Sequence, residues 1–343
     1  MHELARKVLE GQEAWVVGGA VRDELLGREL LDLDIACREP QKAARAYANR
    51  AGGAPFPLSE RHGAWRVALR DRRTVDFTPL RDGIEDDLAT RDFTINAIAR
   101  PLAGGEPVDP FGGQADLEAM RLRAVGESVF RDDPLRLLRA VRLEDELGLR
   151  MDDRTEALVR EHARLVGDPA GERILGELRR LSSGGYRRLD ELGLLGPLGG
   201  EITDRLERLD SPDYRLVAVF GGRLRRLPVS NELRRYARAL TRAERPADDA
   251  RSIHRFRRAT EPWSLDALAF LGATELAPAV EEARRAEPEQ PLLRGDELEL
   301  PAGPEIGRLL GEIDEERAAG TIATKEEALD YARRNARAVR KDR

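Results

Sequence analysis

The fold of the first part of the chain is decided by VVGGAVRDELLGRELLDLDIA, residues 16–36. This stretch predicts an apolar strand, a Gly-Gly turn, a short helix that ends at Gly27, and a second strand that carries Asp32 and Asp34. Residues two apart on a strand project from the same face, so the two carboxylates lie side by side. Such a pair requires a neutralising cation, and carboxylate oxygens favour Mg²⁺.

The residues that open the short helix are suited to a nucleoside triphosphate. Gly18 and Gly19 have no side chains, which lets backbone N–H groups approach phosphates at the start of the helix. Arg22 follows one turn later and can reach the same phosphates. An Asp-x-Asp pair alone is most often part of a solvated edge strand. Together with Gly-Gly-x-x-Arg at this spacing, it indicates a metal and nucleotide site.

Outside this stretch, the apolar periodicity divides the 343 residues into two kinds of structure. Strand patterns occur only before about Leu117, and helical spacing of apolar residues follows. We therefore expect an α+β multidomain protein, with a mixed β-sheet and helices on one side of it in a head over residues 1–118. A helical neck over 119–185 and a helical body and tail over 186–343 should follow. The expected strands are 13–17, 31–37, 64–69 and 73–77, and the expected neck helices are 133–148, 154–166 and 171–181.

Charge and composition narrow the function classes. The net charge of −6 does not by itself indicate a nucleic-acid-binding protein. The segment Arg205–Thr260 nevertheless carries +8, which leaves −14 for the rest, and could follow a phosphate backbone. The alternative is a set of amphipathic helices with Arg on the solvated faces. A single Cys37, no apolar signal sequence and no long apolar run predict a cytoplasmic protein without a membrane partner.

At this point the sequence resembles a known family. Residues 16–36 are similar to the signature of the class II tRNA nucleotidyltransferase and bacterial poly(A) polymerase family, within the polymerase-β-like nucleotidyltransferase superfamily. The resemblance runs almost to the C-terminus through further motifs in the same order. These are DDLATRDFTINAIA (86–99), VDPFGGQADL (108–117), RDDPLRLLRAVRLEDELGL (131–149), GERILGEL (171–178) and LLRGDELELPAGPEIGRLL (292–310).

The resemblance implies a role for each matching residue of the head. Asp32 and Asp34 match the metal-binding catalytic pair. Asp76 matches a third catalytic carboxylate near the primer 3′-OH, although it could equally be a turn residue at the end of a strand. Nucleotide binding is implied for Gly18, Gly19, Arg22, Arg91, Asp92 and Asn96, with Asp92 as acceptor for the ribose hydroxyls. For Asn96, an amide that stabilises a helix is the alternative.

In the neck, the resemblance implies the residues that select the base. Asp133 and Arg136 match the pair that reads the edges of CTP and ATP, and their spacing predicts that both lie on one helix face. Without the family they would indicate an ordinary helix start. Glu172 and Arg173 match residues that support this helix. Two positions depart from the family: Asp132 replaces Glu, and Thr90 replaces an Arg, which puts a phosphate contact in doubt.

The implied activity is template-independent addition of C and/or A to the 3′ end of tRNA from CTP and ATP, with release of pyrophosphate. Two Mg²⁺ ions are implied, one at the primer 3′-OH and one on the triphosphate. The partner is the tRNA acceptor end. Arginines of the basic segment should hold this RNA: Arg223, Arg225, Arg226, Arg234 and Arg235.

Four alternatives remain open at this stage. The first is a CC-adding enzyme that works with a separate A-adding enzyme, because only FTPLRD (77–82) remains for the flexible loop that many CCA-adding relatives carry there. The second is a poly(A) polymerase, although REPQKAARAYANRAGG (38–53) lacks the expected basic run. A non-catalytic RNA-binding relative and a small-molecule nucleotidyltransferase complete the set.

Overall fold

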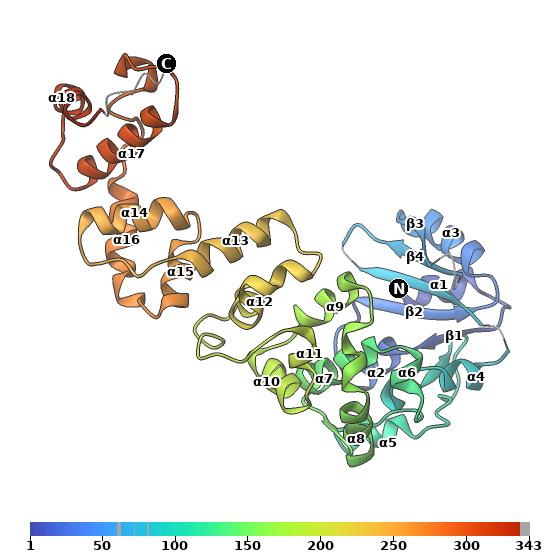
Figure 1. Cartoon of the computed structure of the whole chain (residues 1–343). Helices are drawn as coiled ribbons and strands as arrows, with labels where there is room; N and C mark the ends of the chain where they lie inside the picture. The colour runs from blue at the N-terminus through green and yellow to red at the C-terminus, as the bar shows by residue number, and fades with distance from the viewer. Residues whose placement is uncertain (60–62, 72, 81, 337–343) are drawn as a thin grey trace, which may run out of the picture. The chain divides into compact units, whose positions relative to one another are not determined.

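The computed structural model describes residues 1–59, 63–71, 73–80 and 82–336, apart from the side chains of Ser59, Arg225 and Arg226. The chain forms two compact units, Met1–Gly200 and Glu201–Arg343 (Figure 1). The boundaries expected for head, neck and body remain predictions, since the first unit contains both head and neck. Within the described residues, no helix has the length and apolarity that crossing a bilayer requires.

A six-stranded mixed sheet with the order β3-β4-β5-β2-β1-β6 forms the centre of the head. The four expected strands are confirmed. Two more were missed: β3, which contains two prolines, and β6, which has three residues. The strands are β1 Ala14–Val17, β2 Asp32–Cys37, β3 Ala54–Ser59, β4 Ala64–Ala68, β5 Thr74–Pro79 and β6 Ala99–Pro101. Only β2 and β5 pair in parallel within this sheet.

The two faces of the sheet are covered differently. One face carries Leu33, Val67 and Val75, all fully buried, beneath helix α3 (Pro40–Ala51). Tyr47 of α3 packs on Phe77 at 5.8 Å between ring centroids. The opposite face is covered only at one end, where an apolar cluster joins β1 and β2 to α4. Helices therefore lie on both faces, not on one as expected. The cluster consists of Val17, Ala36, Leu80, Leu88, Ala97 and Ala99.

Short helices surround the sheet and continue into the neck. The head contains α1 His2–Val8, α2 Gly19–Leu25, α4 Ile84–Ala89, the 3₁₀ turn η1 Thr94–Asn96 and α5 Gly113–Glu118. The neck contains α6 Val129–Asp132, α7 Leu135–Leu147, α8 Asp153–His162, η2 Ala163–Gly167, α9 Gly171–Leu178, α10 Ser183–Glu191 and α11 Leu195–Leu198. A two-stranded parallel ribbon, β7 Arg121–Leu122 with β8 Arg150–Met151, interrupts the neck, where no strand was expected.

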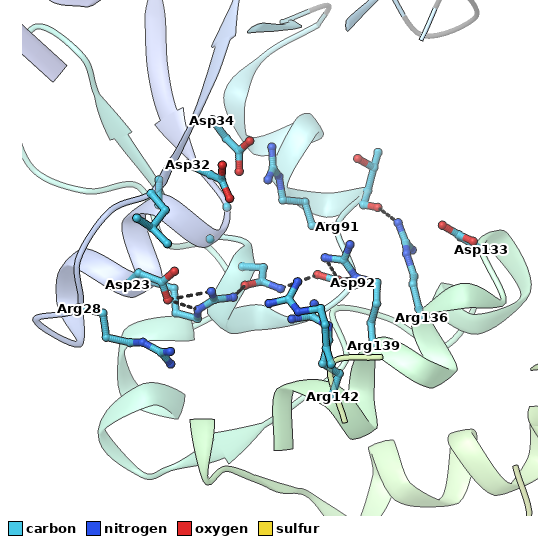
Figure 2. Close-up of a pocket in the computed structure, with 18 of the residues that line it drawn as sticks. Asp23, Arg28, Asp32, Asp34, Arg91, Asp92, Asp133, Arg136, Arg139 and Arg142 are labelled. Carbon is cyan, nitrogen blue, oxygen red and sulfur yellow. Dashed lines mark hydrogen bonds and ion pairs between the residues drawn. The ribbon is translucent and has the colours of Figure 1, made fainter. Parts of the chain in front are cut away.

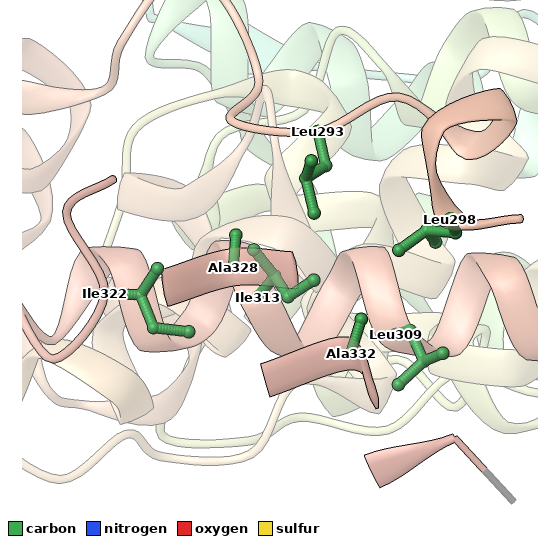
Figure 3. Close-up of a cluster of buried hydrophobic side chains, with 7 residues drawn as sticks. All are labelled: Leu293, Leu298, Leu309, Ile313, Ile322, Ala328 and Ala332. Atoms are coloured by element: carbon green, nitrogen blue, oxygen red, sulfur yellow. The ribbon is translucent and has the colours of Figure 1, made fainter. Parts of the chain in front are cut away.

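The second unit is helical, as expected. Its elements are α12 Pro212–Phe220, η3 Gly221–Arg226, α13 Asn231–Arg242, α14 Ala250–Thr260, α15 Ser264–Leu271, η4 Thr274–Leu276, α16 Ala277–Ala286, η5 Gly295–Leu298, α17 Pro304–Ala318 and α18 Lys325–Asn335. The C-terminal motif forms η5 and the start of α17. Its leucines enter a small core with α18, made of Leu293, Leu298, Leu309, Ile313, Ile322, Ala328 and Ala332 (Figure 3).

A glycine contact braces η1, which carries Asn96. The N-terminus of α5 lies so close to η1 that a Cβ on Gly113 would be 2.1 Å from the carbonyl oxygen of Thr94. Asp109 accepts hydrogen bonds from the Gly113 N–H at 2.7 Å and the Gln114 N–H at 2.9 Å, which holds this turn in place. Thr94 donates to the buried Asp116 at 2.7 Å. The motif at 108–117 is therefore a support for η1.

We expect Gly113→Ala to destabilise the first unit by about 1–3 kcal/mol, because the added methyl group forces α5 away from η1. Urea unfolding at neutral pH measures the change. Gly176→Ala is the matched control: its Cβ would meet nothing within 4 Å, and it lies within helix α9. It should stabilise by roughly 0.5–1 kcal/mol, since Ala loses less backbone entropy than Gly. Equal effects of the two substitutions would contradict the brace.

Candidate active site

Asp32 and Asp34 lie on the face of β2 that α3 does not cover, as the alternation predicted (Figure 2). Asp32 is exposed and accepts a hydrogen bond from the Thr74 hydroxyl at 2.6 Å. Asp34 is partly buried. Burial, followed by the charges of Asp76 and Asp32, raises the pKa of Asp34 to about 6 despite the opposing charge of Arg91. The pair therefore has an excess of negative charge.

Asp76 occupies the same face one strand away. It is the direct neighbour of Asp34 in the parallel β2–β5 register and of Arg66 in the antiparallel β4–β5 register. The Arg66 guanidinium donates to both oxygens of Asp76, each at 2.7 Å. Asp76 is a mid-strand residue with an ion partner, so the alternative of a turn residue is wrong. Its role as third carboxylate stays a prediction.

The turn before α2 requires glycine at its first position. Gly18 has φ +69°, a left-handed conformation that L side chains rarely adopt. A Cβ there would lie 2.6 Å from Nη1 of Arg91 and 3.4 Å from Oδ2 of Asp34. Arg91 is held in this position by Asp87, with Nη2 to Oδ2 at 2.8 Å. The Gly18 backbone, Arg91 and Asp34 thus meet at one point.

A chain of hydrogen bonds links Arg22 of α2 to Arg139 of α7. Arg22 donates to Asn96 at 2.7 Å, and Asn96 donates to Asp92 at 2.9 Å. Asp92 also accepts from the Phe93 N–H at 2.9 Å and from Arg139 at 2.8 Å. Burial opposes ionisation of Asp92, but Arg139, Asn96 and the Phe93 N–H outweigh it and hold its pKa below the ordinary value. Asn96 therefore links Arg22 to Asp92, which is more than the helix-stabilising role expected as the alternative.

Asp92 is only 5% exposed, and its two oxygens already accept these bonds. The expected contact of Asp92 with both ribose hydroxyls stays a prediction, and three hydrogen bonds already occupy acceptor positions of this carboxylate. Arg139 is the group that Asp92 presents to the pocket. Arg139 was missed by the sequence reasoning, although Arg136, Arg139 and Arg142 recur every three residues along one helix, which is a readable signal.

The neck residues expected to select the base lie at the edge of the same pocket. Asp133 precedes α7 in an extended conformation, so it does not share a helix face with Arg136 as predicted. Pro134 explains this, because the residue before proline avoids the helical region. Arg173 donates to Asp133 at 2.7 Å, and Arg136 donates to the Thr90 carbonyl at 2.7 Å.

The 171–178 motif supports the neck helix, but only one of the two residues expected to do so takes part. Arg173 holds Asp133, whereas among the described residues no hydrogen bond or ion pair is formed by Glu172, which is exposed. Glu177 instead accepts from the buried Arg142 at 2.5 Å. Glu146 accepts from the same Arg142 at 2.6 Å. This cluster ties α9 to α7.

These groups surround one pocket of about 550 Å³ between the sheet and α7 (Figure 2). Gly18, Asp32, Asp34, Asp92 and Asp133 line it among others. Seven of the lining residues are arginines: Arg22, Arg28, Arg91, Arg136, Arg139, Arg142 and Arg180. Arg28, Arg142 and Arg180 were also missed from sequence. So many guanidinium groups suit a polyanionic ligand such as a triphosphate.

A divalent cation fits the carboxylate end of the pocket. Asp32 and Asp34 point into a common space, and burial, followed by the charge of Asp76, raises the pKa of Asp34. Within the described residues, no group of three or more His, Cys, Asp or Glu forms a ready-made metal site. Substrate phosphates would supply the remaining ligands, as Mg²⁺ commonly requires.

The basic segment of the second unit is partly neutralised. In α14, Arg251 pairs with Glu316 at 2.7 Å, and Arg255 pairs with Glu315. In α13, Arg234 and Arg235 are exposed, as are Arg238 and Arg242. No ion pair to a described residue holds these four. Arg223 is exposed in η3, and the expected contacts of Arg225 and Arg226 lie outside the described side chains. The solvated-face alternative thus applies to α14 more than to α13.

The head of the chain matches a known family, and two relatives match almost the whole chain. The Poly A polymerase head domain matches residues 14–83 and 66–123. An A-adding tRNA nucleotidyltransferase of Deinococcus radiodurans is 32% identical, over 94% of this chain and 95% of its own length. A CC-adding tRNA nucleotidyltransferase of Thermus thermophilus is 31% identical, over 93% of each chain. The similarity therefore extends through both units.

Solved structures have the same fold. The Thermotoga maritima CCA-adding enzyme complexed with tRNA has a TM-score of 0.71 and 21% identity, covering 98% of this chain and 95% of that chain. A CCA-adding enzyme in complex with ATP reaches a TM-score of 0.78 at the same identity and coverage. The α+β head with a helical remainder is therefore the architecture of these enzymes.

Asp34→Asn should stabilise the metal-free protein at pH 8 by about 1–3 kcal/mol and have a much smaller effect near pH 4. The folded-state pKa of Asp34, about 6, exceeds the unfolded value of 3.8. Ionisation of Asp34 therefore destabilises the folded state as the pH rises above the unfolded pKa, and the full penalty is present above the folded-state pKa. Urea unfolding in a chelating buffer at both pH values measures the difference.

Asp168→Asn is the control for Asp34→Asn, because Asp168 is exposed and lies far along the chain from the carboxylates. Its effect should be the same at both pH values. A pH-independent gain for Asp34→Asn would show that Asp34 ionises at its ordinary pH.

Proposed function

The chain belongs to the tRNA nucleotidyltransferase family, and from this premise we propose that it adds C and/or A nucleotides to the 3′ end of tRNA, using CTP and ATP. One observation carries the proposal: Asp32 and Asp34 stand at the end of a pocket lined by seven arginines. Such a pocket suits a nucleoside triphosphate whose α-phosphorus lies near the carboxylates. Collinear similarity over more than nine-tenths of the chain favours a tRNA enzyme over a poly(A) polymerase.

Asp32 and Asp34 would hold two Mg²⁺ ions. When bound, these ions would polarise the primer 3′-OH and neutralise charge on the triphosphate. The protein orients the reactants. Gly18 allows the backbone to come close to the triphosphate, and Arg91 would contact phosphate oxygens beside Asp34. Asp92 would act by positioning Arg139 and Asn96, and through Asn96 also Arg22. Asp76 would act as the third carboxylate, with Arg66 as its counter-ion.

Asp133 and Arg136 would select the base. Each is held by a neighbour, Asp133 by Arg173 and Arg136 by the Thr90 carbonyl. A pocket with such polar groups rejects a base that leaves them unpaired. The tRNA itself would be held by arginines of the second unit. To Arg223, Arg225, Arg226, Arg234 and Arg235 we add Arg238 and Arg242, because Arg234, Arg238 and Arg242 are spaced by four on α13.

Addition of CC alone is the specific form that we favour. Between β5 and α4 only residues 80–83 remain, fewer than the six inferred from sequence. Leu80 is buried in the apolar cluster against α4, which anchors the connection. A short, anchored connection cannot reshape a base pocket. Addition of A alone is the second candidate, because the Deinococcus radiodurans relative bears that name at the same level of identity.

The deciding experiment uses three tRNA transcripts that end before the first C, after CC and after CCA. Each is supplied separately with CTP or ATP in Mg²⁺, and products are resolved to one nucleotide. We expect two C additions to the first transcript and no addition to the others, because the pocket stays in its C-selecting form. Asp32→Asn serves as the inactive control.

Incorporation of A on the CC transcript, together with C addition, would indicate full CCA synthesis. Addition of A on that transcript alone would indicate an A-adding enzyme. Long tails on every transcript would mean that the tRNA assignment is wrong.

Asp133→Ala and Arg136→Ala should each reduce discrimination of CTP against UTP by about 10- to 100-fold, because each removes hydrogen bonds to a base edge. The measurement is kcat/KM for all four nucleotides. Arg154→Ala is the control, since Arg154 is an exposed neck arginine paired with Glu127 and does not line the pocket. Unaltered discrimination in both variants would refute the role in base selection.

A further inference from the structure

The face of the sheet that carries Asp32, Asp34 and Asp76, here called the carboxylate face, continues beyond the pocket across β4 and β3. The strand registers place one row of neighbours on this face: Asp34 beside Asp76, Asp76 beside Arg66, and Arg66 beside Phe56. Arg66 and Phe56 do not line the pocket. The row therefore leads from the catalytic carboxylates to the edge of the sheet.

Two side chains on this outer part of the carboxylate face, Phe56 and Arg66, are accessible to solvent. Phe56 is 42% exposed, and Leu58, which lies at a bulge in the pairing of β3 with β4, is 45% exposed. The Arg66 side chain is 35% exposed. The neighbours of Arg66 on the same face of β4 are Ala64, which is buried, and Ala68, which is partly buried. An exposed apolar strip of this kind next to a catalytic centre indicates a binding surface.

The chemistry of the strip suits single-stranded nucleic acid. An exposed aromatic ring can stack on any base, and an arginine beside it can face the backbone phosphates. Asp76 engages only two of the five N–H donors of Arg66, at Nε and Nη2. Among the strongly exposed large apolar side chains of the described residues, Phe56 is the only aromatic one.

The edge strand itself argues against a protein occupant that would extend the sheet. Pro55 and Pro57 alternate with Phe56 and Leu58 along β3, and proline has no N–H to donate to an added strand. Phe56 lies three strand spacings from Asp34, about 14 Å at 4.8 Å per spacing. At about 3.4 Å per stacked nucleotide, this corresponds to about four nucleotides. Phe56 is therefore within reach of the last few nucleotides of an RNA whose 3′-OH lies at the carboxylates.

We propose that Phe56, Leu58 and Arg66 bind the unpaired 3′-terminal nucleotides of the acceptor RNA, with Phe56 stacked on one base and Arg66 facing a phosphate. The proposal rests on the proposed function and names the subsite for the primer. The RNA would run along the carboxylate face from the edge strand, so that its 3′-OH reaches Asp32 and Asp34. The nucleoside triphosphate would occupy the arginine-lined pocket on the other side of the carboxylates.

The test measures single-nucleotide addition by the full chain on a tRNA substrate that the wild-type enzyme extends. Phe56→Ala should raise the KM for tRNA by about 5- to 100-fold, the range expected for loss of one base–aromatic stack, while the KM for the nucleotide stays constant. Phe56→Tyr should restore the wild-type KM, because the ring is retained. Met120→Ala is the control, since Met120 is 45% exposed in the same unit and lies outside the sheet.

A second experiment identifies which base of the tRNA stacks on Phe56. An abasic residue is placed in turn at each of the last three positions of the tRNA, and the Phe56→Ala effect is measured again. At one position the effect should disappear, because the stack is already absent. An effect that persists at all three positions, or an unchanged KM for tRNA in Phe56→Ala, would overturn the inference and leave the proposed function intact.

Two further outcomes are informative. Loss of a dimer in Phe56→Ala, seen by light scattering with an unchanged KM for tRNA, would make the strip a subunit interface and the inference wrong. A wild-type enzyme that extends no tRNA transcript with CTP or ATP would overturn the proposed function, and the inference with it.

Discussion

The rest of the site depends on the parallel pairing of β2 with β5. This pairing places Asp34 directly beside Asp76, with Asp32 two residues away on the same face. Carboxylates at such spacing repel one another, and burial of Asp34 intensifies the effect. Neighbouring groups offset the negative charge of the three carboxylates to different extents. Asp76 is paired with Arg66 and Asp32 accepts a hydrogen bond from the Thr74 hydroxyl, while the nearby charge of Arg91 only partly offsets the rise in the pKa of Asp34. The remaining negative charge favours a cation at this position.

The arginines of the two units differ in their partners. Some are held in ion pairs that build the pocket wall. Arg142 joins α7 to α9 through Glu146 and Glu177, and Arg139 is locked by Asp92. Because these guanidinium groups are held before substrate arrives, little ordering remains to be done on binding. The exposed arginines of α13 have no such partners among described residues, which suits a flexible polyanion that is bound and released.

Sequence patterns identified a large part of this architecture. Four strands and three neck helices were correct, because their apolar periodicity is strong and local. The edge strand β3 was missed, since Pro55 and Pro57 are poor strand formers, and its pairing with β4 is a tertiary choice. Asp133 was assigned to a helix that starts only after Pro134. Arg139 and Arg142 were missed because a stripe of arginines on a helix is usually solvated, and only packing decides which ones turn inward.

The sequence by itself determined that Asp32 and Asp34 share one face of a strand next to a glycine turn. Residues two apart on a strand must share a face, and a left-handed turn requires glycine, so Asp32, Asp34 and Gly18 could be recognised without coordinates. Only the tertiary structure decided which residues from distant segments meet them. The row from Asp34 through Asp76 and Arg66 to Phe56 crosses four strands. It exists because of strand order and register, which are set by long-range packing that no local pattern encodes.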